Sequence, residues 1–385
     1  MNNFNYSIPT EVYFGKGQIK NLAEIANLGT KVLMVYGGGS IKRNGAYDEA
    51  CAVLHEAGTK YYELSGVDPN PRIDTVRMGA ELCRSKDIDV VLAIGGGSTI
   101  DCSKVIAAAA CYDGDPWDLV LDGSKIKAAL PVVTVLTMAA TGSEMNGNAV
   151  ISDMGANEKL GTYSHWLKPV FSIEDPKYTY SLPAGQTAAG VADIMSHVFE
   201  QYFTTVSGGF IQARLCEAIL KTCIQYGPVA IKTPKNYDAR ANIMWASSLA
   251  LNELIGYGSG MPWTVHGMEH ELSAFYDITH GVGLAILTPF WMDKVLSDET
   301  TPKFAEYGRN VWGLSDADDD MTTAKKSIEC TREFFKSMGL PETLTEAGVE
   351  EKSLPVMAAK LKNTFKKTYV PLSEADVLEI YQAAL

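Results

Sequence analysis

Three features that often reveal a protein's class are missing from this 385-residue sequence. It has no run of five basic residues, no CxxC pair and no apolar stretch near the roughly 20 residues of a membrane-spanning helix. With 33 Lys+Arg against 46 Asp+Glu and a net charge of −13, it lacks the basic surface that a nucleic-acid-binding protein needs. Residues 1–10 do not resemble a secretory signal, and seven scattered cysteines argue against a disulfide framework. We therefore expect a cytoplasmic protein without nucleic-acid or membrane partners.

The first half of the chain alternates between β-type and helical patterns. Hydrophobic residues make up 46 % of the sequence, which is typical of a well-packed globular protein, and the length suggests two domains. Short apolar runs predict strands over residues 31–36, 60–64, 89–94 and 130–136, with helical patterns over 47–57, 72–85 and 100–111. This alternation is typical of a parallel sheet with helical crossovers. Residues 1–180 are predicted to form an α/β dinucleotide-binding domain.

The second half shows long helical patterns and almost no β-type runs. The predicted helices cover residues 188–202, 210–224, 240–254, 265–275, 322–337 and 373–384. The last of these opens with a capping box, in which Asp376 follows Ser373 by three residues. Residues 181–385 are predicted to form an all-helical domain, with the boundary in the turn-rich segment 175–183.

Two Gly-Gly-Gly-Ser turns follow predicted strands, at residues 37–40 and 95–98. Glycines let the backbone approach a phosphate, and the start of the next helix holds negative charge. In the second turn, Ser98 or Thr99 is expected to cap a helix that begins at Ile100. Neither turn fits the GxGxxG fingerprint, and for each one a tight turn without a ligand stays the alternative.

The first turn also bears on cofactor choice. No carboxylate follows its strand to repel a 2′-phosphate, and Ser40, Lys42 and Arg43 are possible donors nearby. This pattern favours NADP(H) over NAD(H), the alternative being that Lys42 and Arg43 are solvated surface residues. A third strand end, residues 137–144, could line the nicotinamide or its ribose, or could be a capped helix start.

Four of the six histidines lie in the helical half. Asp193 and His197 have i, i+4 spacing, which places a carboxylate and an imidazole on one helix face. His266 and His270 repeat the spacing, and His280 follows. One Asp with two or three His suits Zn²⁺ or Fe²⁺. From spacing alone, metal binding and ordinary hydrogen-bonded histidines are equally compatible with the sequence.

These motifs together resemble those of the iron-containing alcohol dehydrogenase family over essentially the whole chain. The resemblance is carried by residues 95–101, 137–144, Asp193 with His197, residues 266–270 and His280-Gly281. The subgroup that they resemble is the NADPH-dependent butanol dehydrogenase and aldehyde reductase type. One departure is Thr137-Met138, where some family members have two adjacent threonines.

The resemblance implies a cleft between the two domains, a homodimer and one divalent metal ion, Fe²⁺ or Zn²⁺. The implied metal ligands are Asp193, His197, His266 and His280. His270 would lie near the metal without ligating it, as a candidate proton relay or a structural neighbour. The implied cofactor contacts are Gly38, Ser40, Asn70, Gly96, Gly97, Ser98, Thr137, Thr141 and Lys159, with Asp101 as a further candidate.

The expected reaction is reversible hydride transfer between NADP(H) and a small to medium aldehyde or primary alcohol. The metal would act as a Lewis acid on the carbonyl oxygen. One alternative is another metal enzyme of this architecture, such as a polyol or glycerol dehydrogenase or a dehydroquinate synthase-like lyase. The segment 263–281 lacks the Lys and Arg that such a lyase would want for a phosphorylated acid. A non-enzymatic nucleotide- or metal-binding protein is the second alternative. Residues 261–263 could wall an apolar pocket or simply pack in the core.

Overall fold

The computed structural model describes residues 1–260 and 262–385, so Met261, one of the predicted pocket-wall residues, lies outside the described residues. The chain divides into two compact units. The sheet unit comprises Ser7–Leu182 and Thr233–Asn252, and the helical unit comprises Met1–Tyr6, Pro183–Lys232 and Glu253–Leu385. The predicted domain limits and the predicted cleft stay predictions.

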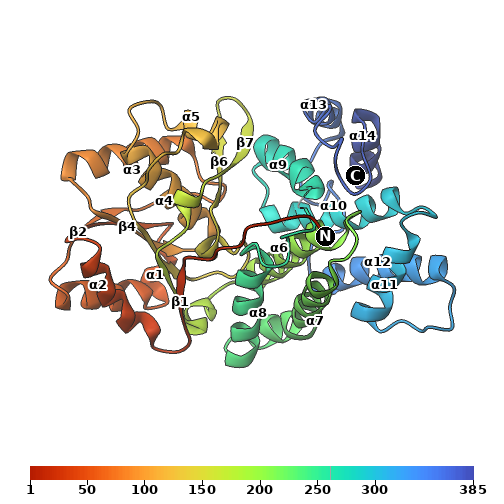
Figure 1. Ribbon diagram of the computed structural model, residues 1–385, viewed down its shortest axis with the longest axis horizontal. Coiled ribbons are helices and arrows are strands. Elements are labelled where there is room, and N and C mark those ends of the chain that lie inside the picture. The colour runs from red at the N-terminus through yellow and green to blue at the C-terminus, as the bar shows by residue number, and fades with distance from the viewer. Residues whose placement is uncertain (261) are drawn as a thin grey trace. The chain divides into compact units, whose positions relative to one another are not determined.

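The sheet unit is built on six parallel strands in the order β1-β8-β5-β4-β2-β3 (Figure 1). The strands are β1 (Glu11–Phe14), β2 (Lys31–Tyr36), β3 (Lys60–Leu64), β4 (Val90–Gly95), β5 (Val132–Leu136) and β8 (Phe171–Glu174). A separate antiparallel pair consists of β6 (Asn148–Asp153) and β7 (Glu158–Tyr163). Strands β4 and β5 are buried along their whole length, as expected of continuous apolar runs with helices on both faces.

Helices cover both faces of this sheet. The helices of the unit are α1 (Ser40–Arg43), α2 (Ala46–Glu56), α3 (Ile73–Lys86), α4 (Gly97–Ala110), α5 (Trp117–Leu121) and α8 (Tyr237–Ala250). One apolar core joins α3 and α4 to the sheet. A second core joins α2 and the 3-10 helix η1 (Gln18–Asn27) to the opposite face. Figure 1 shows α2 and α3 on opposite sides of the sheet. The unit is therefore a three-layer α/β structure.

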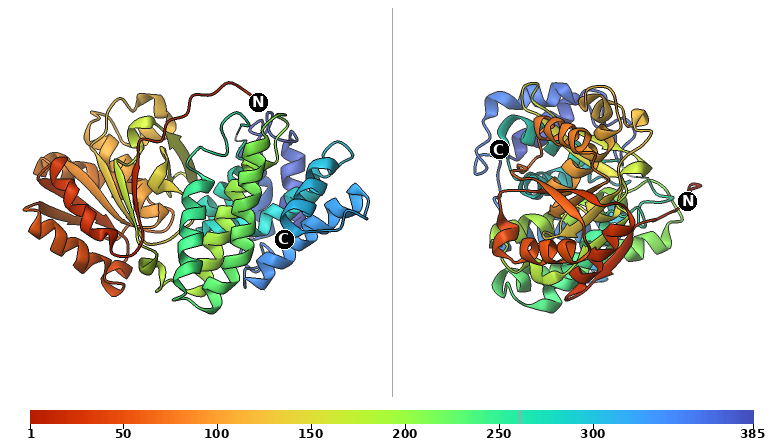
Figure 2. Two further views of the ribbon diagram at one scale, coloured as in Figure 1. Left: turned by 60° about the horizontal axis from the view of Figure 1, so that its bottom comes forward. Right: turned by 90° about the vertical axis from the view of Figure 1, so that its left-hand side faces the viewer.

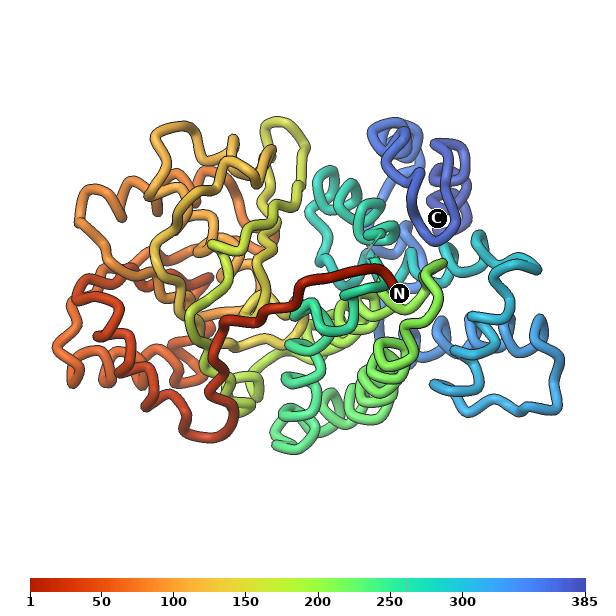
Figure 3. The backbone as a smooth tube through the Cα atoms, viewed as in Figure 1, coloured from red at the N-terminus to blue at the C-terminus, as the bar shows by residue number. Residues whose placement is uncertain are grey.

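The helical unit contains no strand among its described residues. Its helices are α6 (Ala184–Tyr202), α7 (Phe210–Lys232), α9 (Thr264–Tyr276), α10 (His280–Val295), α11 (Thr301–Trp312), α12 (Asp320–Ser337), α13 (Leu354–Lys360) and α14 (Glu374–Ala383). Helices α11 and α12 pack side by side (Figure 2). Met1–Tyr6, the dark red beginning of the tube in Figure 3, belong to this unit, and the Asn2 amide donates to the carbonyl of Gly258 at 2.9 Å.

The predicted fold class is confirmed, with a parallel sheet and helical crossovers first and a helical part after it. The Ser373 capping box is also confirmed. The predicted cap of the helix after the second glycine turn is wrong: α4 begins at Gly97, so Ser98 and Thr99 lie inside its first turn, and no side chain caps it. No described helix is both long and apolar enough to cross a bilayer. The cytoplasmic location stays a prediction.

Candidate active site

Helix α6 presents three polar side chains on one face although it is buried from Thr187 to its end. Asp193, His197 and Glu200 are spaced i, i+4 and i+7, which aligns them along the helix. All three are at most 4 % exposed. Burying a carboxylate is costly unless it is paired, so partners for these groups must come from other helices.

The partners come from α9 and α10. His266 lies in the first turn of α9, and His280 is the first residue of α10. The Asp193 Oδ1 atom lies 3.9 Å from His266 Nε2 and 3.8 Å from His280 Nε2. It also lies 3.4 Å from His197 Nδ1. The structure thus brings together the four residues that the sequence suggested as metal ligands, around one carboxylate oxygen.

A buried glutamate orients His266. Helix α9 begins after Trp263, whose side chain provides no cap, and Glu200 of α6 takes the capping role instead. Its carboxylate accepts hydrogen bonds from the backbone amides of Thr264 at 2.8 Å, Val265 at 2.7 Å and His266 at 3.1 Å. The same carboxylate lies 3.3 Å from His266 Nδ1. With the Nδ1 proton held there, the Nε2 lone pair faces Asp193.

A second buried glutamate acts on His280 in the same way. Glu269, one turn along α9, is fully buried and is in hydrogen-bond contact with His280 Nδ1 and Ser273 Oγ. His280 Nε2 is thereby left on the Asp193 side of the ring. Each of these two imidazoles therefore has one nitrogen fixed by a carboxylate and the other directed at the same point.

The donor set fits a divalent transition metal. His197 Nδ1 and His266 Nε2 are buried, and neither has a hydrogen-bond partner among the described residues. Burial, reinforced by the neighbouring histidines His266 and His280, lowers the pKa of His197 well below its ordinary value, so the ring stays neutral, as metal binding requires. Single donor atoms of Asp193, His266 and His280 all lie within 4.8 Å of one another. Three imidazoles and one carboxylate suit Fe²⁺ or Zn²⁺.

His270 lies beside this cluster rather than at its centre. Its ring centroid is 5.6 Å from that of His280, and it is half-buried. Trp263 packs edge-on against His266 and His197, with centroids 5.2 and 6.0 Å away. Trp263 therefore borders this cluster of candidate metal ligands.

The predicted nucleotide-binding residues gather at one edge of the sheet. Strand β4 pairs with β2 on one side and with β5 on the other, all parallel, so the segments that follow them share the carboxyl edge. Gly38, Gly96 and Thr137 lie in these segments. This edge is where open α/β sheets bind ligands.

The backbone amides at the N-terminus of α4 are available to bind an anion. No side chain caps it, and the first amides of a helix have no partner within the helix. A Cβ on Gly97 would lie 2.5 Å from the Thr141 side chain, so only glycine lets Thr141 approach the helix start this closely. Backbone amides and a threonine hydroxyl are thus grouped at the positive end of a helix dipole.

Among the remaining predicted cofactor residues, Asp101 already makes hydrogen bonds within the protein, and Asn70 and Lys159 are buried. Asp101 accepts from the Ser143 hydroxyl at 2.5 Å and the Val150 amide at 2.9 Å, which ties α4 to β6. Asn70 adopts a left-handed backbone (φ 52°) and is buried, as is Lys159 on β7. Ser40 begins α1, and Ser98 lies in the first turn of α4.

Lys42, a predicted donor at the first turn, is held by aromatic rings. Its Nζ atom lies 4.6 Å from the ring centroid of Tyr47 and 5.2 Å from that of Tyr36. Both phenols donate to Glu63, at 2.8 and 2.6 Å. The structure thus places a carboxylate near this turn that the sequence around the turn did not reveal, because Glu63 comes from β3.

Glu200 and Glu269 were not among the residues predicted from the sequence. Their signal was present in the spacing: Glu200 follows His197 by three residues, and Glu269 follows His266 by three. A glutamate on a helix is most often solvated, however, and it is the packing of α6, α9 and α10 together that buries these two.

Comparison with known proteins agrees with this geometry. Residues 9–176 match the family described as iron-containing alcohol dehydrogenase, and residues 187–385 match its C-terminal domain. The NADH-dependent butanol dehydrogenase A of Clostridium acetobutylicum is 55 % identical over 99 % of both chains. The NADPH-dependent aldehyde reductase YqhD of Escherichia coli is 42 % identical over 94 % of this chain and 93 % of its own.

Solved structures resemble the whole fold. The crystal structure of NADH-dependent butanol dehydrogenase A from Thermotoga maritima superposes with a TM-score of 0.95 at 38 % identity, covering 100 % of this chain and 99 % of its own. Two family models together span most of the sequence, and full-length relatives exceed 40 % identity. The chain belongs to the iron-containing alcohol dehydrogenase family and is an oxidoreductase of the alcohol dehydrogenase type.

Proposed function

We propose that this enzyme interconverts small to medium primary alcohols, such as butanol, and their aldehydes with a nicotinamide cofactor. One divalent ion, Fe²⁺ or Zn²⁺, would be held by Asp193, His197, His266 and His280. The observation that carries the proposal is the convergence of three imidazoles on one buried carboxylate, two of them oriented by buried glutamates.

When bound, the ion supplies Lewis acidity toward the substrate oxygen, and the cofactor supplies or accepts the hydride. The chain's own contribution is preorganisation. Glu200 and Glu269 hold His266 and His280 in the tautomer that directs Nε2 inward, so little rearrangement accompanies loading. Burial keeps His197 neutral.

We propose His270 as the group that passes a proton to the product alkoxide. It is half-buried beside His280, lies outside the group formed by Asp193, His266 and His280, and forms a neighbouring group with Glu269 and His280. An imidazole exchanges protons readily near neutral pH. The variant His270→Gln is expected to keep its metal content while kcat falls by about a hundredfold. Loss of metal together with activity would instead make His270 a ligand or a structural residue.

For the cofactor we propose a preference for NADP(H). The support is the turn after β2, whose own residues Gly37, Gly38 and Gly39 carry no carboxylate and where Ser40 offers a hydroxyl. The carboxylate of Glu63 near this turn is engaged by the phenols of Tyr36 and Tyr47. Relatives named as NADH-dependent and as NADPH-dependent both occur at 42–55 % identity, so the family alone does not decide. The variant Gly38→Asp is expected to raise the KM for NADPH far more than that for NADH. Equal changes would contradict the preference.

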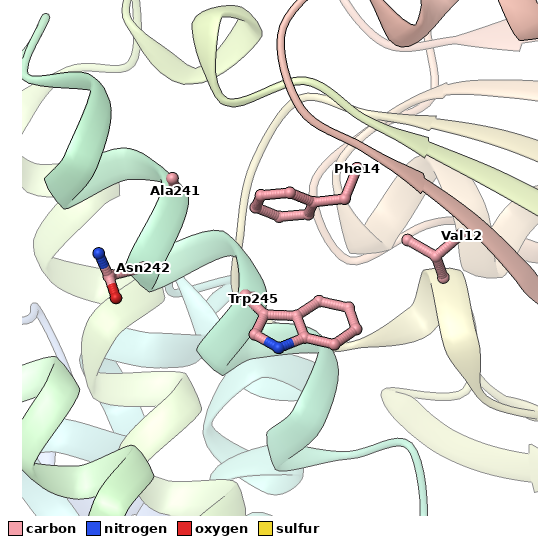
Figure 4. A pocket seen from close by; sticks show the side chains of 5 residues that line it. All are labelled: Val12, Phe14, Ala241, Asn242 and Trp245. Carbon is pink, nitrogen blue, oxygen red and sulfur yellow. The ribbon is translucent and has the colours of Figure 1, made fainter.

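We also propose a homodimer that uses the edge of strand β1. Among the described residues, this strand pairs only with β8, at the end of the sheet. Beside it is a hollow of about 360 Å³ lined by Val12, Phe14, Ala241, Asn242 and Trp245 (Figure 4). The rings of Phe14 and Trp245 meet edge-on there, at 5.7 Å, and Trp245 is 40 % exposed. An open strand edge flanked by an exposed tryptophan and a half-buried phenylalanine favours pairing with a second copy.

The proposed metal site is tested by single substitutions. Asp193→Ala and His266→Ala are expected to lose bound metal and butanal reduction together, measured by elemental analysis and by cofactor absorbance. His55→Ala, at an exposed position on α2, is the matched control and should change neither. Full turnover by a metal-free variant would refute the site. Steady turnover of glycerol but not butanol would favour a polyol dehydrogenase, and cofactor binding without turnover would favour a non-enzymatic protein.

A further inference from the structure

A second cavity of the sheet unit, which we call the cationic cavity, has a volume of about 790 Å³. Its walls come from four separate parts of the chain, namely the loop after β1, the segment from α1 into α2, the segment after β8 and the start of α8. The lining residues are Lys16, Arg43, Asn44, Glu49, Lys177, Tyr180, Ser181, Lys235 and Tyr237. Since β1, β8 and β2 are parallel, the cavity lies at the carboxyl edge of the sheet.

Positive charge dominates this cavity in a protein of net charge −13. Only one of its four cations is neutralised: Lys177 Nζ lies 3.0 Å from both carboxylate oxygens of Glu49. Within the described part of the chain, Lys16, Arg43 and Lys235 form no ion pair. Three cations that converge on one hollow without acidic partners repel one another unless an anion joins them.

Hydrogen bonds fix the segments that carry the cations, while the side chains of Lys16, Arg43 and Lys235 themselves are exposed. Asn44 donates to the Tyr178 carbonyl at 3.0 Å, and the Tyr178 hydroxyl donates to Glu49 at 2.7 Å. The buried carboxylate of Asp175 accepts from the backbone amides of Gly17 at 2.7 Å and Lys177 at 3.0 Å. These bonds join the loops after β1 and β8 and the start of α2, so the cations are carried on a preorganised frame.

We propose that the cationic cavity binds the phosphate group of a small-molecule phosphate monoester. A phosphate dianion matches three uncompensated cations better than a carboxylate does, and a guanidinium such as Arg43 binds two of its oxygens at once. The volume lies in the range of small-molecule sites, and the half-buried rings of Tyr180 and Tyr237 offer a surface for the organic part.

Calorimetric titration of the purified protein with inorganic phosphate, at constant ionic strength, tests the proposal. One phosphate is expected to bind per chain. Arg43→Gln and Lys235→Gln are each expected to weaken binding by about tenfold, the loss of one charge-assisted hydrogen bond. Lys127→Gln, the same charge change at an exposed position outside the cavity, is the matched control. Absence of phosphate binding by the unaltered protein, or equal affinities in all four proteins, would overturn the proposal.

The phosphate group could belong to the cofactor or to a separate metabolite, and steady-state kinetics with butanal distinguishes them. This arm rests on the proposed function. If Arg43→Gln raises the KM for NADPH and not for NADH, the ligand is the 2′-phosphate of the cofactor. If neither KM changes although phosphate binding is lost, the cavity takes a separate phosphorylated molecule. A protein that binds phosphate but does not reduce butanal would refute the proposed function alone.

Discussion

The carboxylate of Glu200 serves two structures at once. It closes the open start of α9, and it holds the ring of His266, which lies in that same first turn. Because Glu200 lies on α6 and caps α9, the two helices are held in a fixed relative position. The orientation of the His266 imidazole therefore depends on how α9 packs against α6. The residue that orients the candidate ligand is therefore also one that stabilises the fold.

Glu200→Gln separates these two roles. An amide oxygen can still accept from the α9 backbone, but it cannot stabilise the His266 tautomer as a carboxylate does. We expect metal affinity to fall by about 10–100-fold, measured by chelator competition, with a smaller loss of about 1 kcal/mol in unfolding free energy. Glu299→Gln, at an exposed site, is the control. Unchanged metal affinity would show that Glu200 only caps the helix.

Glu174 and Glu144 form a buried carboxyl pair in the sheet unit, with the Ser248 hydroxyl between them. Burial and the charge of Glu144 raise the pKa of Glu174 well above its ordinary value of 4.5. The folded carboxyl keeps its proton at pH values where the unfolded one has lost it. Its contribution to stability is therefore complete below pH 4.5 and is lost as the pH rises above that value.

The neutral isostere Glu174→Gln should remove this dependence. Relative to the variant, the unaltered protein is expected to lose up to about 1.4 kcal/mol of unfolding free energy per pH unit as the pH rises from 4.5 toward the raised pKa of Glu174. Urea unfolding at several pH values gives the unfolding free energy of both proteins. In the difference between them, the pH dependence of the titratable groups that they share cancels. Two parallel stability profiles would mean that Glu174 is ionised in the folded protein.

Residues that share a helix turn were easier to predict than residues that meet through packing. The i, i+4 spacing of Asp193 and His197 is visible in the sequence, and the structure brings both to the cluster. The role of Glu200 depends on where α9 begins. The environment of Lys42 depends on Glu63, which is brought close only when β3 pairs with β2. Contacts between residues that are far apart in the chain leave no pattern in the sequence around either residue.

At the scale of elements, one glycine sets how closely α10 approaches α6. A Cβ on Gly281 would lie 2.0 Å from the Ala189 carbonyl oxygen, which no real contact allows. Gly281 directly follows His280, so any displacement of the helix start moves a candidate ligand. Gly281→Ala is expected to lower the unfolding free energy by about 1–3 kcal/mol and to reduce metal content. Chemical denaturation and elemental analysis measure the two effects.

Gly185 provides the matched control for this substitution. It lies in the first turn of α6, and a Cβ there would meet nothing within 4 Å. Gly185→Ala should leave metal content unchanged and stabilise the helix by about 0.5–1 kcal/mol. Equal behaviour of the two variants would show that close packing at Gly281 does not position His280.

The four predicted strands agree with β2, β3, β4 and β5 to within two residues, whereas the helix predicted over 210–224 extends to Lys232 and the one predicted over 240–254 covers Tyr237–Ala250. Other elements were missed for physical reasons. The strands at Lys31–Tyr36 and Lys60–Leu64 were predicted with their observed limits. Helix α10 was missed because it is apolar nearly all round and contains Gly281, Gly283 and Pro289, so no stripe marks it as a helix. Strand β8 is only four residues long, too short for its pattern to stand out.

At the scale of the molecule, the protein as a whole has a net charge of −13, whereas the charged side chains that line the cationic cavity are mainly positive. Because free charges are screened by salt, phosphate binding at this cavity should weaken as ionic strength rises. We expect the measured affinity to fall several-fold between about 0.05 and 0.5 M sodium chloride in calorimetric titrations. Binding that is insensitive to salt would point to recognition by neutral groups and away from Lys16, Arg43 and Lys235.

The proposed homodimer depends on whether the β1 edge is covered in solution. Replacing Trp245 by Lys places a charge beside Phe14 and opposes burial of this surface. Trp245→Lys is therefore expected to halve the mass measured by light scattering, from two chains to one. Trp166→Lys tests an equally exposed tryptophan of the same unit, 46 % accessible against 40 %, and should remain dimeric. A Trp245→Lys protein that keeps the mass of two chains would place the dimer contact on another face.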